Sequence, residues 1–359
     1  MMKLALVITH PIQYYAPVFQ LLAKEVELKV FYTAKKRESF DPGFRQEIIW
    51  DIPLLEGYNY TFNEQKPVIE NLVEFNPHYI LIYGWASSSH IQILMYFKNI
   101  IPILFRGDSN LLGNVPWYRK PLKEYALKWV YAHVKTALYT GTTNKEYFRK
   151  YGLKESQLIF APHAVDNKRF SSHEPSLSVR ASLGLKQNDL LVLFAGKFSR
   201  NKNPILLLHA FLKANIPNTH LLFIGSGVTE DNLRNAARRW NNIHVLPFQN
   251  QKDIPAFYKA ADLFCLPSNH ETWGLSINEA MACGKAVLVS DRCGAAVDLV
   301  THQNGGTFKH QDVNDLKHKL EYFLKQPALL EKAGRQAALD IIEWNFNNQS
   351  RAIINCLYA

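Results

Sequence analysis

The most informative segment of the chain is Glu271-Thr272-Trp273-Gly274-Leu275-Ser276-Ile277-Asn278-Glu279, which Ala280-Met281-Ala282-Cys283-Gly284 follows. A short run of large apolar residues, 261–267, precedes it and stops at Ser268-Asn269-His270, a pattern typical of a buried strand. Ser276, with Glu279 three residues later, predicts a capping box that opens a helix. We therefore expect Glu271 on the loop at the carboxyl end of a strand and Glu279 in the first turn of the next helix.

Such a loop is a natural ligand site. Ligands of open α/β sheets bind outside the carboxyl ends of the strands, and the N–H groups at a helix start bind phosphate. Two flanking carboxylates can accept hydrogen bonds from hydroxyls, as a nucleotide sugar would require. Each glutamate taken singly also has a plain interpretation, because Glu279 can serve as a helix cap and Glu271 as an ordinary loop carboxylate.

The spacing of the two glutamates and the residues after each resemble the E-x7-E signature of retaining GT-B glycosyltransferases, specifically the large GT4 family (glycosyltransferase group 1). The resemblance implies an α/β fold of the GT-B type, with two Rossmann-like doubly wound domains facing an interdomain cleft. It implies that Glu279 holds the ribose hydroxyls and Glu271 a hydroxyl of the donor sugar. The remaining donor-binding residues that it implies in this segment are Trp273, Gly274, Leu275 and Ser276.

The length of 359 residues suits two domains. We expect an acceptor-side domain over residues 1–168, completed by a C-terminal helix at about 340–359, and a donor-binding domain over residues 169–339. The boundary follows from residues 162–170, which resemble the stretch that enters the GT-B linker, and from the polar run 171–178. Lys3–Ile8 and Leu28–Tyr32 are expected to open the first sheet.

Two loops supply candidates in the first domain. Many GT4 members carry a Gly-rich loop after the first strand, where this chain has Thr9-His10-Pro11. His10 either faces the cleft or anchors a turn beside proline. Many members also end a later strand in a His-Asp pair near the reacting sugar, where this chain has Arg106-Gly107-Asp108. Arg106 and Asp108 are catalytic candidates by position, and a structural Arg–Asp pair is the alternative.

The second domain begins with a strand, a glycine, a basic loop and a helix start, which together make an anion site. The segment around Gly196 resembles the G-R-L-x-x-x-K-G segment of GT4 enzymes, whose two basic residues hold the donor diphosphate. Lys197 stands where arginine is usual and Lys202 where lysine is usual, and Arg200 is a further candidate because an ammonium lacks the bidentate fork of arginine. The resemblance adds three residues near the ribose and base: Gly225, Gly227 and Phe248.

Charge and composition limit the partners. The net charge of +10 is modest, so we predict no nucleic-acid partner. Residues 115–170 hold 11 Lys and Arg against 4 Asp and Glu, which suits an anionic partner. The basic, aromatic segment Trp117–Tyr131 either lies on an anionic membrane surface or packs its aromatic side chains inward. No apolar run is long enough to span a bilayer. We expect a cytoplasmic protein with reduced cysteines, either free in the cytoplasm or peripheral on the inner face of the membrane.

The predicted function is transfer of a sugar, with retention, from a nucleotide-diphosphate donor to a hydroxyl of a glycan or glycolipid acceptor. A UDP-sugar is favoured and a GDP-sugar is possible, and the family's common setting is surface polysaccharide or cell-envelope biosynthesis. No Asp-x-Asp motif occurs, so we expect no metal and no cofactor. Two alternatives stay open: a GT-B sugar-nucleotide epimerase and a catalytically silent GT-B subunit that binds a glycan or a partner.

Overall fold

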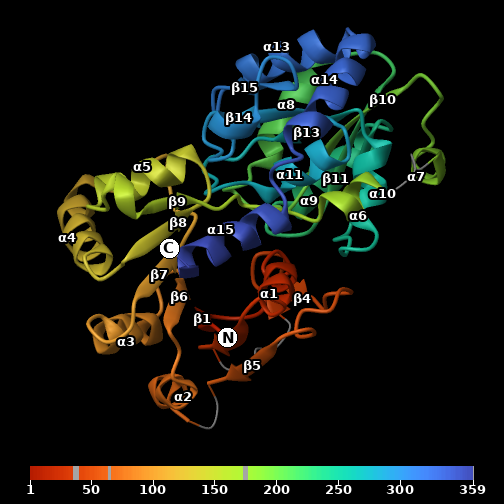
Figure 1. The fold of residues 1–359 in the computed structure, drawn as a ribbon. Coiled ribbons are helices and arrows are strands. Elements are labelled where there is room, and N and C mark those ends of the chain that lie inside the picture. Colours follow the sequence, from red (N-terminus) through yellow and green to blue (C-terminus); the bar gives the residue numbers. More distant parts are fainter. Residues whose placement is uncertain (35–39, 64–65, 173–176, 359) are drawn as a thin grey trace. The chain divides into compact units, whose positions relative to one another are not determined.

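The computed structural model describes residues 1–34, 40–63, 66–172 and 177–358 (Figure 1). The chain divides into two compact units. Unit 1 contains Met1–Glu38, Ile52–Ala164 and Trp344–Ala359, and unit 2 contains Ser39–Asp51 and Val165–Glu343. The chain thus passes into unit 2 twice, the first time for one short segment.

Unit 1 is built on a seven-stranded parallel sheet with the strand order β5-β2-β1-β6-β7-β8-β9. Its strands are β1 (Lys3–Ile8), β2 (Glu27–Tyr32), β5 (Asn59–Phe62), β6 (Tyr79–Tyr83), β7 (Ile103–Arg106), β8 (Thr136–Tyr139) and β9 (Leu158–Phe160). Its helices are α1 (Ala16–Leu22), α2 (Val68–Phe75), α3 (Ser88–Phe97), α4 (Lys120–Tyr131), α5 (Thr142–Lys150) and α15 (Phe346–Tyr358), with short 3-10 turns at Trp117–Arg119 and Glu155–Gln157.

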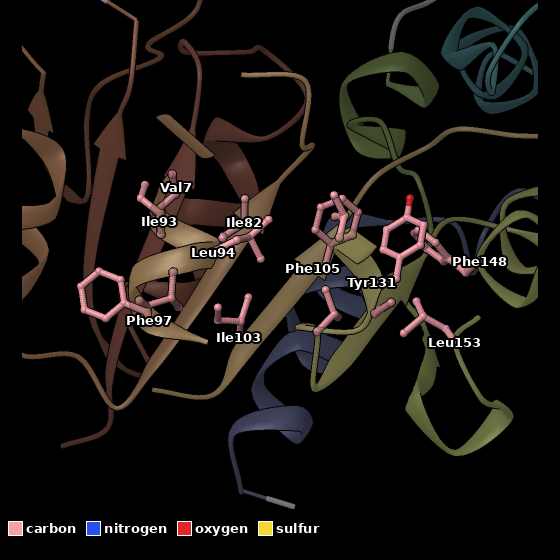
Figure 2. Close-up of a cluster of buried hydrophobic side chains, with 14 of the residues drawn as sticks. Val7, Ile82, Ile93, Leu94, Phe97, Ile103, Phe105, Tyr131, Phe148 and Leu153 are labelled. Carbon is pink, nitrogen blue, oxygen red and sulfur yellow. The ribbon is translucent and has the colours of Figure 1, made fainter. Parts of the chain in front are cut away.

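The sheet of unit 1 is apolar on both faces, as the near-continuous hydrophobic strands require. Ala5 and Val7 of β1 belong to a core with residues of α2, α3, α4 and α5. Leu4 and Leu6 point to the other face and pack with α1 and α15. Figure 2 shows part of the first core, in which Phe105 approaches side chains of α4 and α5. The helix at the end of the chain therefore completes the core of unit 1.

Unit 2 repeats the plan with a six-stranded parallel sheet in the order β12-β11-β10-β13-β14-β15. Its strands are β10 (Leu190–Ala195), β11 (Thr219–Ile224), β12 (Ile243–Leu246), β13 (Leu263–Leu266), β14 (Ala286–Ser290) and β15 (Gly305–Phe308). Its helices are α6 (Asn167–Ser171), α7 (Leu177–Ser182), α8 (Pro204–Ala214), α9 (Glu230–Arg239), α10 (Ile254–Ala260), α11 (Leu275–Ala282), α12 (Ala296–Leu299), α13 (Val313–Leu324) and α14 (Pro327–Asp340). A small antiparallel pair, β3 (Phe40–Asp41) and β4 (Gln46–Glu47), belongs to this unit as well.

In both sheets, chain order reverses between two neighbouring strands. The reversal lies between β1 and β6 in unit 1 and between β10 and β13 in unit 2. In doubly wound sheets the loops on either side of such a reversal diverge and leave a crevice at the carboxyl edge. The predicted α/β class with two doubly wound sheets is confirmed.

The opening of α11 differs from the prediction. The helix begins at Leu275 and its N-cap is Gly274, which has the left-handed φ of 103° that glycine adopts without strain. Ser276 lies inside the first turn and α11 has no side-chain cap, so the predicted capping box is wrong. Glu279 consequently lies two residues deeper in the helix than expected, in its second turn.

Three boundaries also differ from the expected limits. Residues 39–51 belong to unit 2 although they lie inside the range 1–168. The main crossing to unit 2 falls between Ala164 and Val165, before the polar run 171–178, of which residues 173–176 lie outside the described part of the chain. The last helix starts at Phe346 and not at about residue 340, since α14 continues to Asp340 and five residues separate the two helices.

Candidate active site

The reversal point of the second sheet brings two predicted residues together. Lys202 follows β10 and Glu271 follows β13, and these strands are direct neighbours. The Lys202 ammonium donates a hydrogen bond to Glu271 Oε2. Both side chains are mostly buried, with 24% of the lysine and 14% of the glutamate exposed. A cation and a carboxylate thus share one partly desolvated position at the carboxyl edge.

Backbone contacts fix Glu271 in place. Its N–H donates to the carbonyl of Arg292 at 2.9 Å, and its carbonyl accepts from the N–H of Gly294 at 3.0 Å. The carboxylate also accepts a long hydrogen bond of 3.4 Å from the Ser268 hydroxyl. The loop after β13 is therefore attached to the loop after β14 and has little freedom to move the carboxylate.

Asparagines join the loops after β10 and β13. Asn201 donates through Nδ2 to the carbonyl of His270 at 2.7 Å, and Asn269 donates to the carbonyl of Arg200 at 2.8 Å. Asn203, whose φ of 50° is left-handed, donates to Asn269 Oδ1 at 3.2 Å. Arg200 itself is exposed, and it takes part in these contacts through its backbone carbonyl and not through its guanidinium.

The start of α11 supplies backbone N–H groups beside Glu271. Gly274 is buried, and a Cβ there would lie 3.2 Å from Glu271 Cγ, so the chain turns tightly around the carboxylate. Trp273 is only 1% exposed, and its indole N–H donates to Asn278 Oδ1 at 3.0 Å. The Trp273 side chain therefore packs beneath the loop, and the donor-binding role of Trp273 stays a prediction. Leu275 and Ser276 are partly exposed.

Glu279 lies deeper than Glu271, with 5% of its surface exposed. Its Oε2 accepts a hydrogen bond of 2.8 Å from the hydroxyl of Tyr258, which belongs to α10. Tyr258 is itself buried and packs against Phe170 and Phe264. The tyrosine holds the carboxylate in one orientation, a role that the sequence analysis did not assign to it.

The turn after β11 lies directly against the loop after β10. Gly225 has a φ of 145°, and a Cβ there would lie 2.0 Å from the carbonyl oxygen of Gly196. A Cβ at Gly227 would lie 2.7 Å from the carbonyl oxygen of Phe198. These glycines are required because the two loops touch through their backbones.

The remaining predicted donor residues meet the segment that enters unit 2 early. Lys197 places its ammonium 3.0 Å from the carboxylate of Asp41 and 5.1 Å from the ring centroid of Phe44. Phe248 contacts Phe44 edge to face, with ring centroids 4.9 Å apart. The Ser226 hydroxyl, between the two glycines, donates to the carbonyl of Phe44 at 2.7 Å.

A second site lies at the carboxyl edge of the first sheet, in unit 1 alone. A cavity of about 420 Å³ is lined by loops after β1, β6 and β7 and includes Thr9, Gly84, His90 and Asp108. His90 Nδ1 lies 2.8 Å from the Gly84 carbonyl, which can only accept, and Nε2 lies 3.0 Å from the Thr33 hydroxyl. Burial lowers the pKa of His90, so its imidazole is neutral and donates from Nδ1.

Two predicted catalytic residues of unit 1 lie elsewhere. Arg106 is 1% exposed, and its guanidinium donates to the carbonyls of Ala161 and Pro162 at 2.9 and 3.2 Å. The guanidinium of Arg106 therefore supports the chain segment that leaves unit 1, and its catalytic role stays a prediction. His10 contacts Thr9, with Nδ1 2.9 Å from the hydroxyl, and does not line the cavity. Asp108 is the predicted residue that does.

Other expectations concern the rest of the surface. Of the segment Trp117–Tyr131, four large side chains are strongly exposed: Trp117 81%, Tyr118 60%, Leu122 74% and Tyr125 75%. All four cysteines are free and buried. Within the described ranges, no helix is long and apolar enough to cross a membrane. Nor do three His, Cys, Asp or Glu side chains of those ranges gather as metal ligands.

Several polar residues that hold the site together could not be recognised in the sequence. Tyr258 and the asparagines 201, 203 and 269 are isolated polar residues in the sequence, and only the adjacency of β10 and β13 shows what they join. Asp41 and Phe44 lie more than 150 residues from Lys197 and Phe248 along the chain. A hairpin signal at Asp41-Pro42-Gly43 was available, but no pattern indicated which unit it contacts.

Known proteins are similar to this chain in sequence and in fold. Residues 177–340 match the family described as Glycosyl transferases group 1. A D-inositol 3-phosphate glycosyltransferase from Mycobacterium sp. (strain KMS) is 29% identical over 204 residues, covering 51% of this chain and 46% of that protein. One from Gordonia bronchialis is 26% identical over 230 residues, covering 60% and 50%. The chain spans about half the length of the curated relatives it matches.

Solved structures show the same fold over the whole chain. Sucrose-phosphate synthase (tll1590) from Thermosynechococcus elongatus has a TM-score of 0.79 at 18% identity, covering 100% of this chain and 98% of the other. Anabaena Alr3699/HepE has a TM-score of 0.78 at 18% identity, covering 99% and 100%. The chain therefore has the GT-B fold, and its residues 177–340 are similar to the family of glycosyl transferases group 1.

Proposed function

We propose that this protein transfers a sugar, with retention of configuration, from a nucleotide-diphosphate donor to a hydroxyl acceptor. The observation that carries the proposal is the Lys202–Glu271 pair at the reversal point of the second sheet, beside the start of α11. A cation and helix N–H groups suit a diphosphate, and a carboxylate next to them suits a sugar hydroxyl. The match of residues 177–340 to the family of glycosyl transferases group 1 supports the same assignment.

The chemistry follows from where charge develops. The bond from the anomeric carbon to the diphosphate oxygen breaks, the acceptor oxygen forms the new bond on the same face, and the acceptor proton passes to the leaving diphosphate. Negative charge grows on the diphosphate as it leaves. Lys202, Lys197 and the amides at Gly274 and Leu275 would stabilise that charge in a preorganised, partly desolvated place. No metal is assigned to this step, and insensitivity of the rate to chelators is the expected result.

The donor is proposed to be a UDP-sugar, with a GDP-sugar as the second candidate. One structure of Anabaena Alr3699/HepE is described as a complex with UDP-glucose, which makes UDP the first nucleotide to test. Glu279, oriented by Tyr258, would bind the ribose hydroxyls, and Glu271 would bind the donor sugar. The cavity of unit 1 with Asp108 and the neutral His90 would receive the acceptor.

The acceptor is proposed to be a hydroxyl of a glycan or a lipid-linked glycan, in surface polysaccharide or cell-envelope biosynthesis. The exposed Trp117, Tyr118, Leu122 and Tyr125, flanked by lysines, would place the enzyme on the anionic inner face of a membrane. Wild type should sediment with phosphatidylglycerol-containing vesicles and not with pure phosphatidylcholine. Leu122→Ser should weaken binding to the phosphatidylglycerol vesicles. Ile100→Ser should not weaken it, although it removes a side chain of similar exposure elsewhere in unit 1.

The donor assignment is tested by thermal stabilisation with UDP, GDP, ADP and their sugar conjugates. A ligand at a hundred times its dissociation constant adds about 2.7 kcal/mol to the stability of its site. One nucleotide should stabilise wild type, and Glu279→Gln should lose most of the shift. Tyr258→Phe should keep the carboxylate but weaken binding about tenfold, the size expected for one hydrogen bond to a charged group.

Thermal stabilisation, together with incubation of the protein with the donor, separates the alternatives. If no nucleotide stabilises wild type and no donor is hydrolysed on long incubation, the silent-subunit alternative replaces the proposal. If nucleotide is released from the donor sugar without an acceptor and the sugar is epimerised, the epimerase alternative is correct. Release that depends on an acceptor supports transfer.

A further inference from the structure

The segment 40–51 makes its described contacts in unit 2, and those of its hairpin include the predicted donor-site residues Lys197, Gly227 and Phe248. It comprises the hairpin β3–β4 and the residues up to Asp51, all assigned to unit 2. At one end, Asp41 pairs with Lys197. At the other, Asn250 donates to the carbonyl of Ile49 at 2.7 Å, and the carboxylate of Asp51 accepts from the N–H of Lys252 at 3.0 Å.

The hairpin turn reproduces the contacts that a phosphate would make. Both carboxylate oxygens of Asp41 lie 3.0 Å from the Lys197 ammonium. Oδ1 also accepts from the N–H groups of Gly43 and Phe44 at 2.7 and 3.1 Å, which fixes its direction. Burial acts to raise the pKa of Asp41, but the ammonium and the two backbone donors outweigh it and hold the pKa below its ordinary value. At neutral pH the Asp41 carboxylate is therefore charged, and it forms an ion pair with Lys197, the cation proposed to hold the diphosphate.

The space between this turn and unit 2 is filled by backbone and rings. A Cβ on Gly43 would lie 2.6 to 2.9 Å from the side-chain atoms of Lys197, and one on Gly227 would lie 3.1 Å from the Gly43 carbonyl oxygen. Phe44 and Trp50 both meet Phe248, with centroid distances of 4.9 and 6.0 Å. The Phe44–Phe248 contact leaves no gap in which a nucleobase could stack between those two rings.

We propose that residues 40–51 form an inhibitory strap: Asp41 takes the diphosphate position on Lys197, Phe44 covers the base position at Phe248, and a nucleotide-diphosphate donor must displace the strap to bind. This inference rests on the proposed function. The apparent dissociation constant then equals the intrinsic one divided by the fraction of molecules with the strap displaced. Variants that loosen the strap bind the donor more tightly, which is the opposite of what a wall of the binding site would do.

Calorimetric titration of the full chain with UDP, and with GDP if UDP does not bind, tests the strap. Asp41→Asn should tighten diphosphate binding about fivefold, the size expected for a half-exposed ion pair. Glu47→Gln is the matched control, since it removes one negative charge from the exposed side of the same hairpin and should leave affinity unchanged. Uridine, which lacks the diphosphate and carries no charge, should also bind Asp41→Asn more tightly than Glu47→Gln, because the larger displaced fraction uncovers the base position at Phe248. Phe44→Ala should tighten both ligands.

Hydrogen exchange supplies a readout that needs no variant. Saturating nucleotide should raise the exchange of peptides covering 40–51 in wild type, because Gly43 and Phe44 lose their carboxylate acceptor. Weaker binding by Asp41→Asn and Phe44→Ala, unchanged affinity in both, or slower exchange of the segment on nucleotide binding would overturn the strap alone. Failure of wild type and both strap variants to bind any nucleotide would overturn the proposed function and the strap with it.

Discussion

Removing Lys202 should destabilise unit 2, and the losses caused by changing Lys202 and Glu271 should not add when both are changed together. Lys202→Met leaves the Glu271 carboxylate, 14% exposed, beside an apolar side chain. Breaking a buried ion pair by removing one partner costs about 3–5 kcal/mol. The lysine keeps 24% exposure, so solvent screens part of the loss and we expect about 2–3 kcal/mol. The Glu271 backbone, held by Arg292 and Gly294, gives the carboxylate no easy escape to water.

Hydrogen–deuterium exchange of the central strands measures the loss of stability in unit 2 separately from unit 1. The amides of Leu193 in β10 and Phe264 in β13 lie in paired register at the middle of the sheet. A loss of about 2–3 kcal/mol should accelerate their exchange roughly 30- to 150-fold, at 1.4 kcal/mol per factor of ten. Glu271→Gln should accelerate it less, since a neutral amide can still accept from Lys202.

The double variant decides whether the two side chains act together. Lys202→Met with Glu271→Gln should restore about 1.5 kcal/mol relative to the sum of the single changes, because no uncompensated charge remains. A coupling below about 0.5 kcal/mol, the ordinary scatter of additivity, would mean that the pair does not form in solution and would remove the main support for the donor site. Both single variants should lose transfer activity.

Two further perturbations test the loop contact and the buried histidine. Gly225→Ala should destabilise unit 2 by about 3 kcal/mol or more, because its Cβ would meet the Gly196 carbonyl at 2.0 Å. Gly184→Ala, at a φ of 70° with nothing within 4 Å, should cost only about 1 kcal/mol, and equal losses in urea unfolding would refute the clash. Burial and the charge of Arg106 hold the pKa of His163 well below its ordinary value. The unfolded chain therefore binds the proton first, and wild type should lose about 1.4 kcal/mol of stability per pH unit below about 6.5 relative to His163→Gln. A difference between these two proteins that stays constant from pH 7 to pH 5 would contradict this.

The central strands of both sheets were predictable because they are short apolar runs between polar turns. The expected strand Lys3–Ile8 has the bounds of β1, and the expected strand Leu28–Tyr32 starts one residue after β2. The topology rule then supplies what the linear sequence cannot: β10 and β13 are neighbours, so Lys202 and Glu271 meet although 69 residues separate them. Candidates that follow adjacent strands were the ones that came together.

Predictions that rested on one residue type at one position were less successful. Ser276 followed by Glu279 satisfies the capping pattern, but Gly274 can take the left-handed N-cap conformation and the helix starts before the serine. Trp273 was assigned to the ligand, yet its indole has a buried partner in Asn278. Arg106 was aligned with a catalytic position, yet its side chain points to two backbone carbonyls. In each case the competing partner lies in the tertiary structure and not in the local pattern.

The two lysines proposed for the diphosphate each meet a carboxylate, and the anchoring of those carboxylates gives them opposite effects. Glu271 belongs to a loop attached by backbone hydrogen bonds to the loop after β14, so it stays with Lys202 and holds the ammonium in place. Asp41 belongs to a hairpin whose described hold on unit 2 is that ion pair, the Ser226 hydrogen bond and a few ring and end contacts. A diphosphate can replace the second carboxylate but must bind beside the first. Neutralising Glu271 should therefore weaken donor binding and neutralising Asp41 should strengthen it, although both changes add the same charge to the same edge of the sheet. A general electrostatic attraction for the donor would give both variants the same sign, so the difference between them isolates the geometry.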